Sequence, residues 1–414
     1  MTMTWPMKRI ADVVQPTESI DPGQTPNKEF DYIDVSSTSN KTYQVVSTQR
    51  LKGQDAPSRA RRLVRSDDVI FATIRPTLQR LALISSDLDQ SVCSTGYVVL
   101  RPGPCVKPKY LFYALLRNEF RHQMEQLQKG ASYPAVLDSE VKSHLFPVPP
   151  IPEQKRIVAI LDEAFAGINA AIMNAEMNLD NGRVLFESYR DSVFAQKDEG
   201  WTEKQFAAIA SIKHGYPFQS RYFVEDGKYV LLTPGNFYET GGYRDRGNKQ
   251  KFYNGPVPEG YVLQKGDMLL AMTEQAAGLL GSPAIVPEDQ LFLHNQRLGL
   301  VVPHEETPWC NRFFFHAFNT AAFRRKVHDD ASGVKVRHTS PKKLGDVKLA
   351  FPQSLAQQIA VANRLDECAR QTSALEVLGQ HKLSALAELK QSILQKAFAG
   401  ELTANEVERE LAAA

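Results

Sequence analysis

Arginines, glutamines and lysines next to aromatic residues are the side chains of this 414-residue sequence whose types and spacing could do chemistry. Four arginines fall within seven residues, at Arg59, Arg61, Arg62 and Arg65. Arginine neutralises phosphates and can read guanine through a bidentate pair of hydrogen bonds. The run therefore indicates either a nucleic-acid contact or a solvated charged loop.

Two further polar clusters follow β-rich runs at residues 69–74 and 268–272. The first cluster holds Arg75, Gln79 and Arg80, and the second holds Thr273, Glu274 and Gln275. Arginine suits guanine, glutamine suits adenine, and glutamate can accept a hydrogen bond from cytosine. Equivalent loops with different side chains are what two different base readers need, and also what two diverging surface loops show.

A second pair of loops follows a predicted helix in each half of the chain. One loop carries Tyr133, and the other carries Lys335 and Arg337, whose alternation places them on one strand face. Two basic-aromatic clusters add candidate phosphate contacts, which position a protein on DNA without specifying sequence. Their members are Lys213, Tyr216, Lys249 and Lys251.

Sequence motifs of catalysis are absent. There is no phosphate-binding loop, no dinucleotide-binding glycine loop, no nucleophile elbow and no H-E-x-x-H metal helix. The four cysteines form no C-x-x-C pair, which argues against a zinc site or a disulfide framework. Asp67 and Asp68 could be metal ligands, but Asp267 is the counterpart of Asp68 before a second strand, which favours a role in a turn. These absences favour a binding protein over an enzyme.

Composition and charge fit a soluble protein of several domains. Hydrophobic residues make up 43% of the chain and charged residues 23%. No apolar run approaches the roughly 18 residues of a membrane helix, and the N-terminus has no apolar signal core, so we expect a cytoplasmic protein. Residues 1–148 and 201–348 each carry 19 Lys and Arg against 15 Asp and Glu. That excess allows an anionic partner.

The sequence repeats itself once, at offsets of 196–204 residues. Leu161-Asp162-Glu163, for example, returns as Leu365-Asp366-Glu367. The repeat predicts four segments in which globular and helical parts alternate. We expect globular units at 1–148 and 201–348 and helical spacers at 149–200 and 349–414.

The expected fold is α+β, with mixed α/β units alternating with two long helices. Strands are predicted at 69–74, 97–100, 268–272 and 298–302, and helices at 110–128 and 311–327. A coiled-coil stripe runs through Ile157, Leu161 and Ile168, with a possible helix break at Asn181-Gly182. A similar stripe holds Leu375, Leu378, Leu386, Leu389 and Ile393. The helices should pair as an antiparallel coiled coil about a pseudo-twofold axis, unless each stripe packs onto its own domain.

Two stretches carry a resemblance to a known family. They are the run Pro149 to Val158 with Leu161-Asp162, and the run Glu388 to Thr403. With the strand entries at 67–72 and 266–271, they resemble the specificity (S) subunit of type I restriction-modification systems. The second spacer departs from the pattern, because residues 351–358 lack the P-x-P-E-Q form of residues 150–154.

The resemblance implies two target-recognition domains, each reading half of a bipartite, asymmetric site in double-stranded DNA. It implies helices that set the gap between half-sites and dock two methyltransferase (M) subunits. This chain would be non-catalytic and without a cofactor. S-adenosylmethionine, ATP and magnesium would belong to the M subunits and to restriction (R) subunits where the system restricts.

Three other interpretations remain. The chain could serve a system that only methylates. It could be a coiled-coil scaffold with protein-binding heads, which predicts no DNA binding. It could be a nuclease using Asp67 and Asp68, which predicts metal-dependent activity in the isolated chain.

Overall fold

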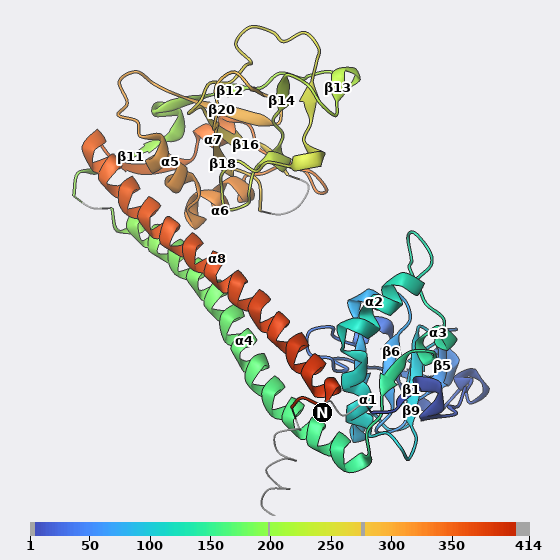
Figure 1. The fold of residues 1–414 in the computed structure, drawn as a ribbon. Helices are drawn as coiled ribbons and strands as arrows, with labels where there is room; N and C mark the ends of the chain where they lie inside the picture. Colours follow the sequence, from blue (N-terminus) through green and yellow to red (C-terminus); the bar gives the residue numbers. More distant parts are fainter. Residues whose placement is uncertain (1–4, 198, 275–277, 403–414) are drawn as a thin grey trace, which may run out of the picture. The chain divides into compact units, whose positions relative to one another are not determined.

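The computed structural model describes residues 5–197, 199–274 and 278–402. Their contacts divide the chain into unit 1 (Met1–Ala175 with Gln380–Ala414) and unit 2 (Glu176–Gly379). Two long helices, α4 (Ile151–Gln196) and α8 (Leu355–Ala399), each contribute one half to each unit. The elements before α4 form head 1, and those between α4 and α8 form head 2 (Figure 1).

Head 1 is built on a four-stranded sheet in the order β2-β9-β6-β7. Its central strand β6 is buried along its whole length and pairs antiparallel with β9, with Val69 opposite Leu100. Helices α1 and α2 cover this sheet and enclose the core of the head (Figure 1). The bounds are β2 Val14–Gln15, β6 Val69–Ala72, β7 Leu81–Leu83, β9 Tyr97–Pro102, α1 Pro108–Leu115, α2 Asn118–Leu127 and α3 Asp138–Lys142.

Two smaller sheets complete head 1. One has the order β4-β3-β8-β5, in which β3 and β8 are parallel with Tyr32 opposite Val92. The other pairs β1 with β10, with Met7 opposite Pro147, and so brings both ends of the head together at the start of α4. The bounds are β1 Met7–Arg9, β3 Glu29–Ile33, β4 Gln49–Lys52, β5 Ala60–Leu63, β8 Val92–Ser94 and β10 Leu145–Pro147.

Head 2 repeats these pairings with its own strands. β16 and β20 form the buried antiparallel centre, β14 and β19 the parallel pair, and β11 and β22 the closing pair. Head 2 also contains a short two-stranded sheet, in which β17 pairs with β21. The bounds are β11 Trp201–Gln205, β12 Ala210–His214, β13 Phe223–Val224, β14 Tyr229–Leu231, β15 Phe252–Tyr253, β16 Met268–Ala271, β17 Thr273–Glu274, β18 Pro283–Ile285, β19 Phe292–Leu293, β20 Leu298–Pro303, β21 Arg337–His338, β22 Lys348–Pro352, α5 Asn311–Phe318, α6 Ala321–Asp329 and α7 Pro341–Gly345. The predicted internal repeat and the four predicted strands are confirmed.

The two predicted short helices are wrong in one respect, because each is broken in two. In head 1 the side chain of Gln391 accepts from Asn118 N–H at 3.1 Å and donates to Leu116 C=O at 3.0 Å, which satisfies the groups freed between α1 and α2. In head 2, Asp191 accepts from Ala321 N–H at 3.1 Å and Thr320 caps α6. Side chains from the long helices therefore stabilise both breaks.

The long helices are continuous, and the predicted break at Asn181-Gly182 is absent from α4. In unit 2, Leu179 lies against Gly379 and Gly182 against Thr372, so the two helix halves run antiparallel. In unit 1 the early part of α4 packs with the late part of α8. A single glycine costs about 1 kcal/mol in a helix, which tertiary packing easily offsets.

The apolar stripes are only partly used for packing. Ile157, Leu161 and Ile168 are buried in the core of unit 1, and Leu386 and Ile393 pack against that core. Leu375, Leu378 and Leu389 are 62%, 63% and 46% exposed. By length and composition α4 could cross a membrane, which is weak evidence because helices that pack on soluble domains pass the same test.

Candidate nucleic-acid interface

In head 1 the structure brings together the two candidate loops that the sequence placed far apart. Arg75 N–H donates to Pro134 C=O at 2.7 Å, and Val136 N–H donates to Thr73 C=O at 3.0 Å. Residues 73–80 and 129–136 thus form one structure, which we call the first tip. The first tip gathers Arg75, Gln79, Arg80 and Tyr133 at one end of the head.

Of the four candidate residues in the first tip, Arg75 and Tyr133 are the exposed ones. The Arg75 guanidinium lies 5.8 Å from the centre of the Tyr133 ring, which is part of a side chain 74% exposed. Arg75 has a left-handed backbone with φ 50°, which is rare outside glycine and is held here by the cross-loop hydrogen bond. A cation beside a ring at a loop tip can bind phosphate or stack on a base.

Gln79 and Arg80 point into the head instead. Gln79 Nε2 donates to Leu115 C=O at 3.2 Å, and Arg80 Nη1 donates to Val35 C=O at 3.1 Å. Both side chains therefore brace the loop in this structure, and base contact would require them to leave these partners.

The arginine run lies on and beside β5. Arg61 pairs with Asp21 at 2.9 Å, and Arg62 pairs with Asp138 at the start of α3. Arg59 is exposed. Arg65 pairs with Glu18 at 2.6 Å. Three of the four arginines are thus already compensated by carboxylates, which lowers the positive potential of this run.

Head 2 has an equivalent second tip, formed in the described part of the chain by residues 272–274, 278–280 and 331–339. Here the two loops pair through β17 and β21, with Thr273 opposite His338 and Glu274 opposite Arg337. Lys335 is exposed, while Arg337 donates to the ring of His328. Gln275 lies outside the described residues.

Glu274 is buried and anchors the backbone of the second tip. It is 4% exposed, and its Oε2 accepts from the N–H groups of Gly278, Leu279 and Leu280 at 2.9–3.1 Å. Its Oε1 has no hydrogen-bond partner among the described residues and lies 3.9 Å from His328 Nε2. A carboxylate that accepts several backbone N–H groups fixes a loop.

The basic-aromatic clusters of head 2 lie on and after β12 and around β15, outside the segments that form the second tip. Lys213 Nζ donates to Gly260 C=O at 2.7 Å and sits 4.7 Å from the centre of the Tyr261 ring. Tyr216 packs on the same ring at 5.4 Å. Lys249 and Lys251 are exposed. These residues therefore belong to head 2 but not to the segments of the second tip.

Sequence reasoning missed the residues that hold each head on its long helix. Gln154 is fully buried: its Oε1 accepts from Lys107 N–H at 2.8 Å, and its Nε2 donates to Cys105 and Pro149 C=O at 2.9 and 2.8 Å. In head 2, Gln358 makes the same three bonds, with Cys310 N–H and with Pro308 and Pro352 C=O, at 2.8–3.0 Å. The offset of 204 residues that links Leu161 to Leu365 also links these glutamines and could have identified Gln358.

A second repeated anchor lies two turns along each helix. Asp162 accepts from Lys109 Nζ at 2.7 Å and from Tyr113 OH at 2.5 Å. Its counterpart Asp366 accepts from Arg312 and from His316 Nε2, both at 2.7 Å. The same helix positions therefore hold both heads with different partners.

The remaining candidate groups are structural. Asp68 accepts from Arg65 N–H at 2.9 Å and pairs with Arg101, which confirms its role in a turn. Burial lowers the pKa of His144 and of His294 to about 4. Within residues 5–197, 199–274 and 278–402, no group of three His, Cys, Asp or Glu side chains could hold a metal ion.

Comparisons with known proteins all point to one family. Residues 3–176 match the model of the type I restriction modification DNA specificity domain. The type I restriction enzyme EcoBI specificity subunit of Escherichia coli is 26% identical over 211 residues, which are 50% of this chain and 40% of that protein. The match thus spans less than half the length of that relative.

Solved structures match over nearly the whole chain. A chain from a structure on complex assembly and conformational transition of the type I R-M system has a TM-score of 0.80 and 26% identity, covering 96% of this chain and 98% of that chain. The HsdS subunit of Thermoanaerobacter tengcongensis has a TM-score of 0.55 and 26% identity, covering 96% and 97%. The likeness therefore includes both heads and both long helices.

Proposed function

Because the chain belongs to the family of type I restriction-modification specificity subunits, we propose that it is the sequence-specific DNA-recognition subunit of such a complex. Residues 1–148 and 201–348 are the two target-recognition domains, and 149–200 and 349–414 are the helical spacers. Each domain reads one half of a bipartite site in double-stranded DNA. The observation that supports this best is the pair of tips, built from equivalent loops but with different side chains.

The tips suggest how reading is divided. In the first tip, Arg75 beside Tyr133 combines a cation with a flat ring at the exposed end of the head. In the second tip, Lys335 is the exposed cation, on a loop fixed by Glu274 beneath it. Arg59, Lys213, Tyr216, Lys249 and Lys251 contribute phosphate contacts that set register. The modest positive charge suffices because other subunits share the phosphate contacts.

The partners follow from the same proposal. Two M subunits, which bind S-adenosylmethionine and methylate adenine, dock on α4 and α8. R subunits bring ATP- and magnesium-dependent translocation and cleavage where the system restricts. This chain carries recognition without catalysis, in the cytoplasm.

The test is sequencing of the methylome of a methylation-free host that expresses this chain with its neighbouring M subunit. We expect one bipartite adenine-methylated motif, lost when this chain is omitted. Arg75→Ala should relax one position in one half-site and Lys335→Ala should weaken the other half, at about 1–3 kcal/mol for a base contact.

Arg9→Ala is the control, since Arg9 is an exposed cation on β1, away from the first tip. It should leave the motif and its methylation level unchanged. No motif from a soluble, assembled complex would instead favour a scaffold whose heads bind proteins.

A further inference from the structure

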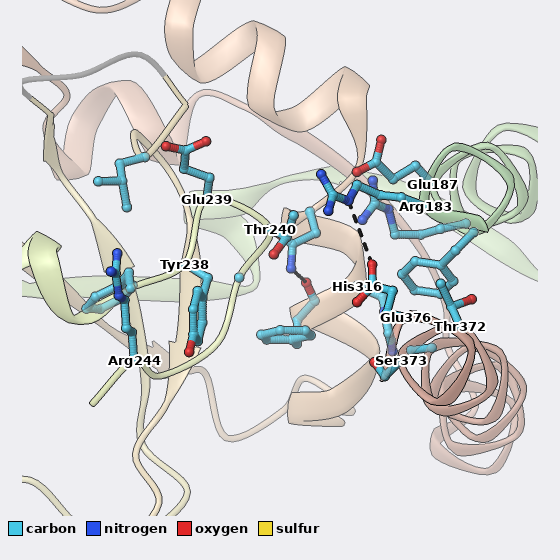
Figure 2. A pocket seen from close by; sticks show the side chains of 18 of the residues that line it. Arg183, Glu187, Tyr238, Glu239, Thr240, Arg244, His316, Thr372, Ser373 and Glu376 are labelled. Carbon is cyan, nitrogen blue, oxygen red and sulfur yellow. Dashed lines mark hydrogen bonds and ion pairs between the residues drawn. The ribbon is translucent and has the colours of Figure 1, made fainter. Parts of the chain in front are cut away.

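Unit 2 contains a cleft of about 550 Å³ between the second half of α4, the first half of α8 and the loop 235–244. Figure 2 shows charged and aromatic side chains reaching into it from all three segments. Its charged lining side chains are Arg183, Glu187, Arg190, Glu239, Arg244 and Glu376. None of these six belongs to the tips proposed to read DNA, and the second tip contributes Leu279 to the lining.

The corresponding place in unit 1 is filled by aromatic rings. The Lys390 ammonium on α8 lies between the Tyr43 and Phe165 rings, 4.9 and 4.8 Å from their centres. The Tyr43 ring in turn packs edge-on against Phe112 at 6.5 Å. Burial among these rings lowers the pKa of Lys390. In unit 1, then, two rings enclose one cation at the junction of head and helices.

The repeat shows which parts of this cluster persist in unit 2. The offset of 200 residues that links Gln391 to Asp191 also links Lys390 to Arg190. Phe112 corresponds to Phe315, because α1 and α5 align at an offset of 203. The cation and one ring are therefore retained.

The two rings that enclose the cation are not retained. The offset of 204 that links Gln154 to Gln358 places Ala369 where unit 1 has Phe165. Gly241 takes the place of Tyr43 in the equivalent turn. Both residues have a positive φ, 89° for Gly241 and 56° for Tyr43. The N–H of Gly241 donates to Tyr238 C=O and the N–H of Tyr43 donates to Ser39 C=O, each at 3.0 Å. Ala369 and Gly241 both line the cleft.

Arg190 is consequently left with fewer aromatic neighbours than Lys390. It is 7% exposed, lies 5.8 Å from the Phe186 ring and pairs with Asp191 at 3.4 Å. A planar guanidinium stacks well on aromatic rings. The space opened by Ala369 beside it suits one aromatic ring supplied from outside the chain.

The charges around the cleft indicate a protein rather than a nucleic acid. Arg183, Arg190 and Arg244 are matched by the carboxylates of Glu187, Glu239 and Glu376. Near-neutral walls with three carboxylates disfavour a phosphate backbone, whose binding depends on excess positive charge. They suit a peptide, whose polar groups can pair with either sign.

The helix segments that line the cleft also carry exposed apolar side chains. Leu185 on α4 and Leu375 and Leu378 on α8 are 71%, 62% and 63% exposed, close in sequence to the cleft residues Arg183 and Glu376. Exposed leucines of this kind suit contact with a protein. The same segments of α4 and α8 therefore provide both the cleft and apolar side chains for a protein partner.

We propose that this cleft receives an aromatic side chain of the M subunit that docks on unit 2. The proposal rests on the proposed function, which supplies the M subunit as partner. Because unit 1 fills the equivalent space with its own rings, the two M subunits bind with unequal affinity, and the one on unit 2 has an anchor that the other lacks.

The experiment measures binding of the purified M subunit to the full-length chain by native mass spectrometry and calorimetry. Ala369→Phe gives unit 2 the ring that unit 1 carries at Phe165 and closes the cleft. Buried aromatic anchors are interface hot spots, so we expect one of the two binding events to weaken tenfold or more. Ala360→Phe is the matched control: Ala360 is exposed on the same helix, nine residues earlier and hence on the opposite face.

Hydrogen exchange of residues 235–244 with and without M subunit provides a second readout, and thermal unfolding checks that each variant folds. We expect protection on binding in the natural chain and its loss in Ala369→Phe. Unchanged binding by Ala369→Phe, without protection of 235–244, overturns this inference and leaves the DNA-recognition role intact. If the natural chain binds no M subunit, the proposed partner and this inference fall together.

Discussion

At the residue scale, each tip contains two kinds of polar side chain. Some are exposed to solvent, and others form hydrogen bonds to the backbone that hold the loop in place, which we call bracing. Arg75 and Lys335 are exposed, whereas Gln79 and Glu274 are hydrogen-bonded to backbone groups beneath them. A polar residue in a loop can therefore matter for recognition in two ways, by contact or by holding the loop in place. Substitutions should distinguish the two, because bracing residues affect stability and contacting residues affect the sequence read.

Glu274→Ala tests the bracing role. The three backbone N–H groups of residues 278–280 lose their acceptor, and unmet buried groups cost about 1–3 kcal/mol. Chemical denaturation should show that loss for unit 2, while the methylated sequence stays the same. Glu225→Ala, an exposed carboxylate in the same head, should change neither. A changed base preference at full stability would assign Glu274 to direct reading.

Acid should destabilise both heads through His144 and His294. Burial lowers the pKa of each to about 4, whereas an unfolded histidine has a pKa near 6.5. Between these values the unfolded chain binds more protons, so stability is full above pH ~6.5 and falls as the pH drops toward 4. The expected loss is on the order of 1 kcal/mol per histidine at pH 5.5.

Urea unfolding at pH 7.5 and 5.5 measures this loss. His144→Phe should reduce the pH dependence of unit 1 and His294→Phe that of unit 2. His304, exposed in head 2, provides the control substitution His304→Phe, which should leave the pH dependence as it is. If the natural chain and all three variants show the same pH dependence, the loss of stability in acid does not come from His144 and His294.

Residue types in the tips could be predicted from the sequence, but their orientations could not. The spacing predicted Arg75 and Glu274 in the loops that follow the strands, and the structure places Glu274 in the short strand β17. Whether each points outward depends on the left-handed backbone at Arg75 and on contacts across the tip with residues about 60 positions away. Such long-range pairings leave no local pattern in one sequence.

At the element scale, each head is fixed to its long helix by one buried glutamine and one aspartate in the first turns. Gln154 and Gln358 each use the amide nitrogen for two bonds and the amide oxygen for one bond to backbone groups. The strands were predictable because short, buried apolar runs have a clear local signature. The breaks between α1 and α2 and between α5 and α6 were not, because Gln391 and Asp191 stabilise them from remote helices.

Gln358→Ala should loosen head 2 on α8. Three buried backbone groups lose their partners, which costs about 2–4 kcal/mol. Differential scanning calorimetry should show a lower unfolding temperature for unit 2, and the methylome should show sites with altered gaps between half-sites. Gln357→Ala removes the exposed neighbouring glutamine and should have no effect. Unchanged stability in Gln358→Ala argues against the anchor.

At the scale of the whole molecule, the two units are interleaved along the chain. Unit 1 takes its last helix segment from residues 380–399, after the whole of unit 2. Leu394, Ala397 and Phe398 from that segment are buried in the core of unit 1. The stability of the N-terminal head thus depends on the C-terminal part of the chain.

A chain ending at Gly379 should therefore lose stability in unit 1 and not in unit 2. Removal of several buried apolar side chains costs about 5 kcal/mol or more. Hydrogen exchange should become faster in β6 and β9 while β16 and β20 stay protected. A chain ending at Leu402 retains those side chains and should behave like the full chain. Equal destabilisation of both heads would show that the units do not unfold separately.

The repeated anchors have a consequence for how such a chain can evolve after gene duplication. Gln154, Gln358, Asp162 and Asp366 stayed in place while the side chains of the two tips diverged. The attachment of the heads thus depends on a small set of positions shared by both halves, and the tips differ in their side chains without disturbing these positions. A lineage can acquire a new target in one head by mutation or recombination while the inherited attachment of that head remains unchanged.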